Sequence, residues 1–237
     1  MMKHQSTKAP QMESTLGQAV KNILVIGAAG GTGRATVEQL LRGGHRVTAF
    51  SRNGEFKSRQ SDRLRVITGD ATALADINRA VAGQDVVIVI LGINENPLRV
   101  RLFGATRTPD NIRSIGTQNV IAAMVNHGVS QIIIQSSYGV GMTRHLLGFA
   151  DRLVFTLLLK PQIEDTEIQE QQVRDSGLDW VIVQPVHLTD DNASNSPFIS
   201  TQGQTRMMKV ARQSVAQFFA VVVGQPEYIG QSVAVSG

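Results

Sequence analysis

Short apolar runs rich in β-branched residues alternate with longer segments of helical periodicity from Ile23 onward. This alternation is typical of parallel strands joined by helical crossovers. The runs that predict strands are Ile23–Ile26, Arg46–Phe50, Arg65–Thr68, Val86–Leu91, Gln131–Gln135 and Trp180–Gln184. The segments that predict helices between them are Gly33–Leu41, Leu74–Val81, Asn111–His127 and Ile163–Ser176. The pattern therefore predicts an α/β fold with a doubly wound, mostly parallel sheet and helices on both faces.

The regular alternation fails after Pro185. The stretch Thr189–Gln204 is rich in Asp, Asn, Ser and Gly, and it is followed by a predicted helix at Ser214–Val223 and a last strand at Gln231–Val235. We expect this tail to form a small, irregular C-terminal cap on the substrate side. A second irregular stretch, Asn94–Pro109, follows the fourth strand, where the loops of such sheets bind ligands. It carries three arginines, Arg99, Arg101 and Arg107.

The chain has 237 residues, a length that is routinely one α/β domain. Residues 1–21 are polar and lack an apolar core of signal-peptide length, so we expect a disordered arm there and one domain over residues 22–237. The most apolar run, Leu153–Leu159, is far shorter than the roughly 20 residues of a membrane span. We expect the segment Gly148–Leu159 to be ordinary core, or alternatively a lid or a subunit contact.

The composition excludes several kinds of site. The chain has no cysteine, which rules out disulfides and thiolate metal sites and fits a cytoplasmic protein. Its histidines show no metal-ligand spacing, so no metal is expected. The net charge of +4 is modest and the arginines are scattered, which favours a small anionic ligand and argues against nucleic acid. We expect no membrane partner, and a monomer or a homodimer.

A glycine-rich segment, Gly27-Ala28-Ala29-Gly30-Gly31-Thr32-Gly33, directly follows the first strand and opens a helix. In this context Gly27 can take a tight turn, Gly30 can let the backbone approach a pyrophosphate, and Gly33 can let helix and strand pack closely. The free N–H groups of the helix then face the phosphates, with Ala29, Gly31 and Thr32 lining the turn. The segment predicts a Rossmann-type dinucleotide site, although its G-x-x-G-x-x-G spacing differs from the commoner G-x-G-x-x-G. The alternative is a purely structural turn.

The end of the second strand indicates which dinucleotide is bound. It reads Phe50-Ser51-Arg52, where a site for NAD would usually place a carboxylate on the ribose 2′-hydroxyl. A guanidinium at Arg52 suits a 2′-phosphate instead, and Arg34 could add positive charge on the same side. We therefore expect NADP(H) in preference to NAD(H). The alternatives are that Arg52 is a solvated surface residue or that Glu55 binds the ribose.

Two further strand ends contribute by position. Gly69-Asp70-Ala71 follows the third strand and would place Asp70 and Ala71 near the adenine. Leu91-Gly92 follows the fourth strand and would let the chain pass close to the ribose. Asp70 could equally be the N-cap of the next helix.

The sequence resembles the atypical short-chain dehydrogenases/reductases, in the NAD(P)-binding, NmrA-like group that includes flavin reductase/biliverdin-IXβ reductase. The resemblance covers roughly residue 22 to the C-terminus. It rests on the glycine loop and on the segments Ser51-Arg52, Gly69-Asp70, Val81-Ala82-Gly83-Gln84-Asp85, Ala122–Val129, Ser176-Gly177-Leu178 and Pro185–Asp190. Typical members of the superfamily use a Tyr-x-x-x-Lys pair. Here the residues four positions after Tyr138 and Tyr228 are Met142 and Ser232, so that mechanism is disfavoured.

The resemblance implies that Ser137 and His187 line the substrate pocket, and Ser136 and Pro185 are expected to bind the cofactor. Ser137 would orient the substrate or nicotinamide, and His187 would donate a hydrogen bond and relay a proton; no catalytic role falls to Tyr138. Local alternatives are a strand-end cap for Ser137 and a loop anchor for His187. The expected function is an NADPH-dependent reductase that transfers hydride to a planar conjugated small molecule, of the flavin or quinone class. A non-catalytic NADP(H)-sensing regulator of the NmrA-like type is the alternative, and a nucleotide-sugar epimerase or dehydratase is a third reading.

Overall fold

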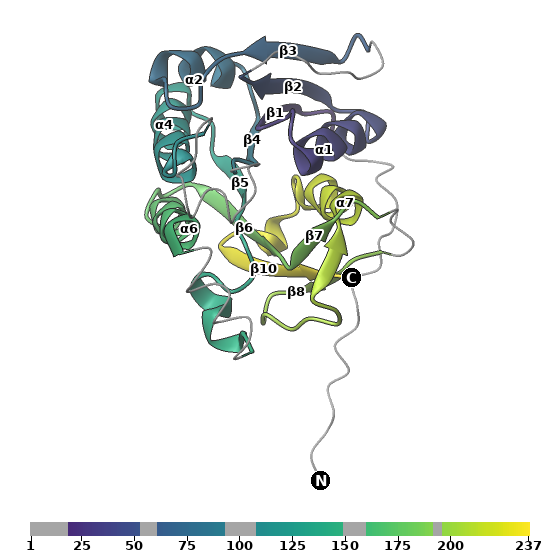
Figure 1. Ribbon diagram of the computed structural model, residues 1–237. Coiled ribbons are helices and arrows are strands. Elements are labelled where there is room, and N and C mark those ends of the chain that lie inside the picture. Colours follow the sequence, from purple (N-terminus) through teal and green to yellow (C-terminus); the bar gives the residue numbers. More distant parts are fainter. Residues whose placement is uncertain (1–18, 53–60, 93–107, 149–159, 192–195) are drawn as a thin grey trace.

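A computed structural model describes residues 19–52, 61–92, 108–148, 160–191 and 196–237. Its centre is a sheet whose strands all pair in parallel except at one edge, where β10 and β8 are antiparallel (Figure 1). The strands, in order across the sheet, are β3 (Leu64–Thr68), β2 (Arg46–Ser51), β1 (Asn22–Ile26), β4 (Val86–Val89), β5 (Gln131–Gln135), β6 (Asp179–Pro185), β10 (Gln231–Ser236) and β8 (Phe198–Ser200). The predicted α/β architecture is confirmed.

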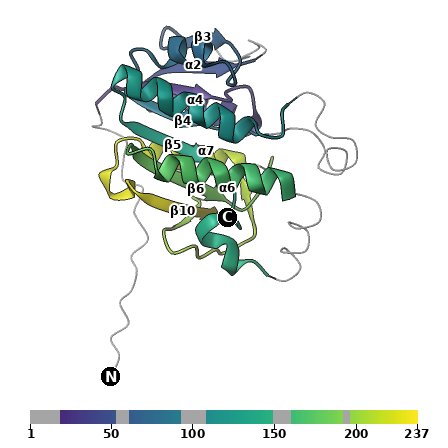
Figure 2. The same cartoon turned by 90° about the vertical axis from the view of Figure 1, so that its left-hand side faces the viewer.

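Both faces of the sheet are buried because side chains of successive strand residues point to opposite sides. In β1, Ile23 and Val25 belong to one hydrophobic cluster and Leu24 and Ile26 to the other, and all four are fully buried. Helices α1 (Gly31–Arg42) and α7 (Arg212–Val222) cover the first face. Helices α2 (Leu74–Val81), α4 (Ile112–His127) and α6 (Lys160–Arg174) cover the second (Figures 1 and 2).

The order of the strands reverses between β1 and β4. From β1 the chain winds outward through β2 and β3, and from β4 it winds the other way through β5 and β6. At such a switch point the connections leave in opposite directions, which opens a crevice at the carboxyl ends of the two central strands. The fold therefore places a ligand crevice next to the glycine turn.

The C-terminal segment is more regular than the sequence indicates. Strands β7 (His187–Thr189) and β9 (Lys209–Ala211) form a separate parallel pair, and the stretch Thr189–Gln204 contains β8. The prediction of an irregular stretch there was thus wrong over 198–200. Strands of three residues are too short to display a recognisable alternation, and β8 is held by its pairing with β10, which is remote in sequence.

Most predicted elements are confirmed, with shifted ends. Helix α1 begins at Gly31 rather than Gly33, α6 begins at Lys160 rather than Ile163, and β4 ends at Val89 rather than Leu91. The first 18 residues of the expected arm, and residues 149–159 of the apolar segment, lie outside the described residues. Within the described ranges, no helix has both the length and the apolar character needed to cross a membrane.

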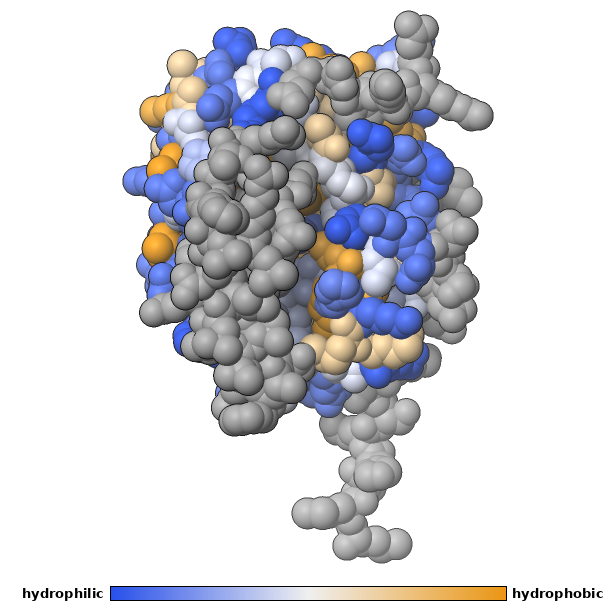
Figure 3. Space-filling view, in the orientation of Figure 1, coloured by the Kyte–Doolittle hydropathy of each residue, from blue (hydrophilic) through white to orange (hydrophobic). Residues whose placement is uncertain are grey.

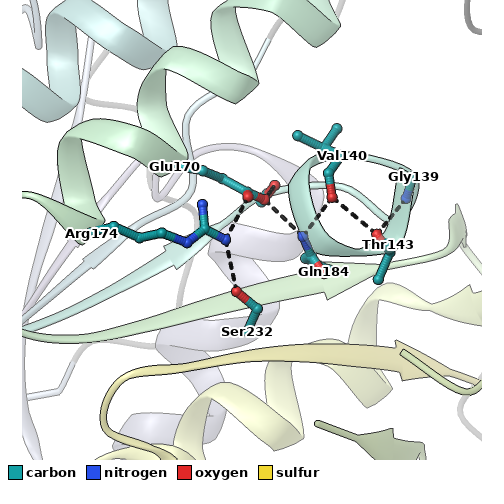
Figure 4. A network of polar contacts seen from close by, with 8 residues as sticks. Gly139, Val140, Thr143, Glu170, Arg174, Gln184 and Ser232 are labelled. Atoms are coloured by element: carbon teal, nitrogen blue, oxygen red, sulfur yellow. Dashed lines mark hydrogen bonds and ion pairs between the residues drawn. The ribbon is translucent and has the colours of Figure 1, made fainter. Parts of the chain in front are cut away.

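A buried polar network ties α6 to the loop that follows β5 (Figure 4). The Glu170 carboxylate is 1% exposed; it pairs with Arg174 at 2.9 Å and accepts hydrogen bonds from Gln184 at 2.8 Å and from the Ser136 hydroxyl. The Gln184 amide also donates to the carbonyl of Val140 at 3.0 Å. One carboxylate thus fixes the ends of two neighbouring strands and the start of the loop.

We expect Glu170→Ala to lower the free energy of unfolding by about 3 kcal/mol, because it removes the ion-pair partner of Arg174 and leaves the buried Ser136 hydroxyl and one N–H of Gln184 without an acceptor. Glu167, which pairs with Arg144 at the surface, provides the matched control. Glu167→Ala should cost less than about 1 kcal/mol. Urea unfolding of both variants measures the difference. Equal losses would show that the Glu170 network contributes no more than a surface pair.

Candidate functional site

A cavity of about 450 Å³ lies at the carboxyl ends of the central strands. Its described lining comes from the glycine turn, from the ends of β2, β4 and β5, from the starts of α4 and α7, and from β7. Many residues predicted to bind the cofactor line it: Gly27, Ala29, Gly30, Gly31, Thr32, Ser51, Arg52, Ala71, Leu91 and Gly92. Figure 3 shows the molecule in the orientation of Figure 1, and polar residues predominate on the part of that face which the structure describes.

The glycine turn is possible only without side chains at two positions. Gly27 has a φ of +86°, and a Cβ there would lie 2.1 Å from the carbonyl oxygen of Ile90. A Cβ on Gly33 would lie 2.2 Å from the carbonyl oxygen of Gly27. At Gly30 the nearest atom to an added Cβ is 3.4 Å away, so the protein itself leaves room there. The first two glycines therefore shape the turn, whereas the open space at Gly30 lies on the side where a ligand would approach.

The N-terminus of α1 is free to bind an anion. Gly30 occupies the N-cap position, no side chain caps the helix, and its first turn contains no acidic residue. The first N–H groups of a helix have no intrahelical acceptor, and the helix dipole adds partial positive charge there. The glycine turn therefore presents backbone donors to the cavity in the way that phosphate sites require.

Three arginines, and no Asp or Glu, are among the described residues that line the cavity. Arg212 packs against Gly31, where an added Cβ would lie 2.7 Å from its Cδ, and forms an ion pair of 3.4 Å with the largely exposed Asp190. Arg52 donates a hydrogen bond of 2.8 Å to the Thr108 hydroxyl. The positive charges of the lining thus lie at separate places around the cavity, which suits a ligand with more than one anionic group.

Arg113 lies in the first turn of α4. Its backbone N–H donates to the Asp165 carboxylate at 2.9 Å, while its Nη1 makes only a long hydrogen bond, 3.5 Å, to the carbonyl of Gln135. A Cβ on Gly92 would lie 3.1 Å from its Nη2. Burial lowers the pKa of Arg113, and the charge of Asp165 partly opposes this shift. The guanidinium is therefore held at the cavity wall with few partners.

Sequence reasoning missed several lining residues: Thr108, Arg113, Gln135, Leu188 and Arg212. The stretch Asn94–Pro109, where ligand binding is predicted, includes Thr108 and ends shortly before Arg113; its arginines Arg99, Arg101 and Arg107 lie outside the described residues. Nothing local distinguishes Arg212, which reaches the glycine turn only because α1 and α7 pack side by side.

Other predicted cofactor residues lie outside the described lining. Arg34 is exposed on α1. The Asp70 carboxylate accepts from the backbone N–H and the hydroxyl of Thr72, each at 2.9 Å. The alternative that Asp70 caps α2 was wrong, because Ala73 holds the N-cap position. The Ser136 hydroxyl donates to Glu170, and the carbonyl of Pro185 accepts from the N–H of Tyr138 at 2.9 Å.

Ser137 and His187 flank the cavity but are not among its described lining residues. Ser137 is half-buried two positions after the lining residue Gln135, and His187 is exposed one position before the lining residue Leu188. His187 is exposed at the start of β7, at the margin of the cavity. The structure thus places the pair beside the cavity.

Tyr138 belongs to the core. Its hydroxyl donates a hydrogen bond of 3.0 Å to the carbonyl of Gly203, and burial raises the pKa of the phenol while a hydrogen bond with Thr205 opposes the shift. The phenol is therefore bonded to the C-terminal segment, and it is not among the described residues that line the cavity.

The residues present fit a dinucleotide. An uncapped helix N-terminus beside an open glycine position can receive a pyrophosphate, Arg212 lies against the same turn, and Arg52 stands at the end of β2 where the adenosine ribose is bound in this fold. The apolar lining residues Leu91, Ile90 and Leu188 can exclude water from a flat ring.

The two glycine environments predict different responses to alanine. Gly33→Ala should lower the free energy of unfolding by more than about 1 kcal/mol, because the new methyl group collides with the turn backbone. Gly30→Ala should change it by less than about 0.5 kcal/mol, since the site has room and a φ of −68°. Thermal or urea unfolding compares the two variants. A larger loss in Gly30→Ala would contradict the assigned roles.

Comparisons with known proteins agree with this geometry. Residues 27–226 match the model of the NAD(P)H-binding family. The chain is 28% identical, over 233 residues, to an uncharacterized chloroplastic protein of Arabidopsis thaliana, and the match covers 94% of this chain and 79% of that protein.

Solved structures share the fold. The chain is similar to a short-chain dehydrogenase/reductase from Veillonella parvula in complex with NADP, with a TM-score of 0.74, 17% identity, and coverage of 92% and 95% of the two chains. It is also similar to an anaerobillin reductase from Escherichia coli O157:H7, with a TM-score of 0.71, 22% identity, and coverage of 91% and 96%. With the family match spanning most of the sequence, the chain belongs to the NAD(P)H-binding family of Rossmann-fold proteins.

Proposed function

We propose that the protein is an NADPH-dependent reductase whose hydride acceptor is a planar conjugated small molecule of the flavin or quinone class. The observation that carries the proposal is the makeup of the described lining, which combines three arginines with apolar side chains, backbone groups and a few neutral polar side chains, and has no Asp, Glu, His, Lys or Tyr. A site of this kind can hold an anionic dinucleotide and a flat ring. Among the described lining residues it has no general acid for a simple ketone.

The residues assigned to the dinucleotide follow from their positions. The backbone of Gly30, Gly31 and Thr32, together with Arg212, would hold the pyrophosphate, and Arg52 would hold the 2′-phosphate. Arg52 is oriented by its hydrogen bond to Thr108. The guanidinium fork of Arg52, at the end of β2 where a 2′-phosphate would lie, is the reason for proposing NADP(H) over NAD(H).

A reduced nicotinamide supplies the hydride when it is bound, and a flavin or quinone acceptor can take its proton from water. The protein's own task is to exclude water from one side of the ring and to orient it. Leu91, Leu188 and Ile90 provide the apolar wall. Ser137 and His187 are proposed to contact the acceptor at the edge of the cavity, Ser137 by a hydrogen bond and His187 at the entrance.

The same lining suits a second candidate, an NADP(H)-sensing regulator without turnover. Binding a dinucleotide needs the glycine turn and the arginines, and it needs no acid or base. Titration with NADPH, NADH and NADP⁺, followed by NADPH oxidation with FMN, riboflavin and a short quinone panel, separates the two. Turnover of any acceptor supports the reductase. Tight binding that favours NADP⁺ over NADPH, with no acceptor reduced, supports the sensor, and failure to bind any dinucleotide contradicts both.

We expect Arg52→Gln to weaken NADPH binding about tenfold or more and to leave NADH binding nearly unchanged, because only NADPH carries the 2′-phosphate. Arg65→Gln, which removes an exposed arginine on β3, is the matched control and should change neither affinity. Nicotinamide fluorescence titration measures both. If Arg52→Gln weakened the two dinucleotides equally, the assignment of the 2′-phosphate to Arg52 would be wrong.

For the acceptor, we expect Ser137→Ala to lower kcat/KM about tenfold at saturating NADPH, since a hydrogen bond that orients the ring is lost. His187→Ala should raise KM for the acceptor more than it lowers kcat. His127→Ala, at the exposed end of α4, is the control for histidine loss. Stopped-flow and steady-state rates with the best acceptor test this, and unchanged kinetics in both variants would remove the two residues from the site.

A further inference from the structure

Arg113 is a cation at the wall of the cavity that forms no ion pair with any other described residue. No carboxylate in the part of the chain that the structure describes lies within ion-pair distance of its guanidinium. Its printed side-chain contact is the long hydrogen bond to the carbonyl of Gln135. A partly buried guanidinium in a lining position normally finds an anion, either in the protein or in a ligand.

The nearby Asp165 is already engaged. One carboxylate oxygen accepts the backbone N–H of Arg113, and the other accepts the backbone N–H and the hydroxyl of Ser114. Asp165 therefore caps the N-terminus of α4 and makes no ion pair with the Arg113 side chain. Its charge helps to keep the guanidinium protonated in the protein interior.

The other anion-binding groups of the cavity lie elsewhere. If the proposed function is correct, Arg52 and Arg212 face the 2′-phosphate and the pyrophosphate, at the end of β2 and over the glycine turn. Arg113 lies beyond β4, between Gly92 and the end of β5. The glycine turn thus separates Arg52 from Arg113, so a dinucleotide held at both Arg52 and Arg212 leaves the charge of Arg113 unused.

A second polar group stands beside Arg113. Gln135 is among the residues that line the cavity, and its buried Oε1 has no hydrogen-bond partner among the described residues. An unsatisfied buried amide oxygen costs free energy unless a ligand donates to it. The pair therefore offers a cationic donor for an anion and an acceptor for a neighbouring N–H or hydroxyl group.

We propose that Arg113 and Gln135 form a subsite for an anionic group of the hydride acceptor. This deepens the proposed function and rests on it: the acceptor is a planar conjugated molecule that carries a carboxylate or a phosphate, with a hydrogen-bond donor close to that group. Arg113 fixes the anion, and Gln135 selects the adjacent donor. The subsite would set which acceptors are used and in which orientation.

The test measures binding rather than turnover, so it remains informative for a protein that reduces nothing. The protein saturated with NADP⁺ is titrated with two matched pairs, FMN against riboflavin and anthraquinone-2-carboxylate against anthraquinone-2-carboxamide. In at least one pair the anionic member should bind about tenfold more tightly. Arg113→Leu should remove that preference while changing the Kd of the neutral member and of NADP⁺ by less than about twofold.

Three variants complete the design. Arg46→Leu removes an exposed arginine at the amino end of β2 and should keep the preference. Arg113→Lys should keep part of it, because the charge remains without the guanidinium fork. Gln135→Leu should weaken the binding of both FMN and riboflavin, whose ribityl hydroxyl groups supply the donor for the amide oxygen. Melting curves verify folding, and Arg113→Gln replaces Arg113→Leu if the leucine variant unfolds.

The opposing outcomes are distinct. Equal binding of anionic and neutral members in both pairs by the unmodified protein would overturn the subsite while leaving the proposed reductase intact. Loss of NADP⁺ binding in Arg113→Leu would assign this arginine to the dinucleotide instead. If the unmodified protein binds no dinucleotide, the proposed function itself fails.

Discussion

The site depends on one close approach of backbone to backbone, that of Gly27 to the carbonyl of Ile90. The contact leaves no room for a Cβ, and it brings the turn after β1 against the end of β4 at the switch point of the sheet. Gly33, in the first turn of α1, adds a second constraint, because a Cβ there would collide with the carbonyl of Gly27. Together they direct the N-terminus of α1 into the cavity, and they explain why the phosphate-binding geometry comes from residues that lack side chains.

Around that turn, positive charge is supplied by elements that are distant in sequence. Arg52 follows β2, Arg113 opens α4 and Arg212 opens α7. Each lies at an element boundary, where the carboxyl edge of the sheet gathers loops and helix starts. Since Arg212 packs on Gly31, the C-terminal segment covers the glycine turn and also contributes a cationic side chain next to it. The cavity is thus one cationic site assembled by the winding of the whole chain.

The sequence carried enough information to predict the fold and the part of the site formed by the glycine turn and the end of β2. Strands such as Val86–Val89 and the glycine turn are encoded by local periodicity and by the steric needs of a turn, which act over a few residues. The contacts of Gln135 and Arg212 with the cavity come from the packing of helices and strands far apart in the chain, which leaves no local pattern. The three-residue strands of the C-terminal segment were not predicted for the same reason, because they form through pairing with distant strands rather than through local propensity.

Burial also separates the polar groups into supporting and ligand-facing sets. The Ser136 hydroxyl and the side-chain N–H groups of Gln184 hydrogen-bond with Glu170 or with the backbone behind the end of β5, and the Tyr138 hydroxyl donates to the carbonyl of Gly203, so these donors are occupied within the protein. At the same strand end, the amide oxygen of Gln135 has no partner within the described chain. A polar ligand bound next to Arg113 and Gln135 would supply the partners that these two groups lack within the described residues.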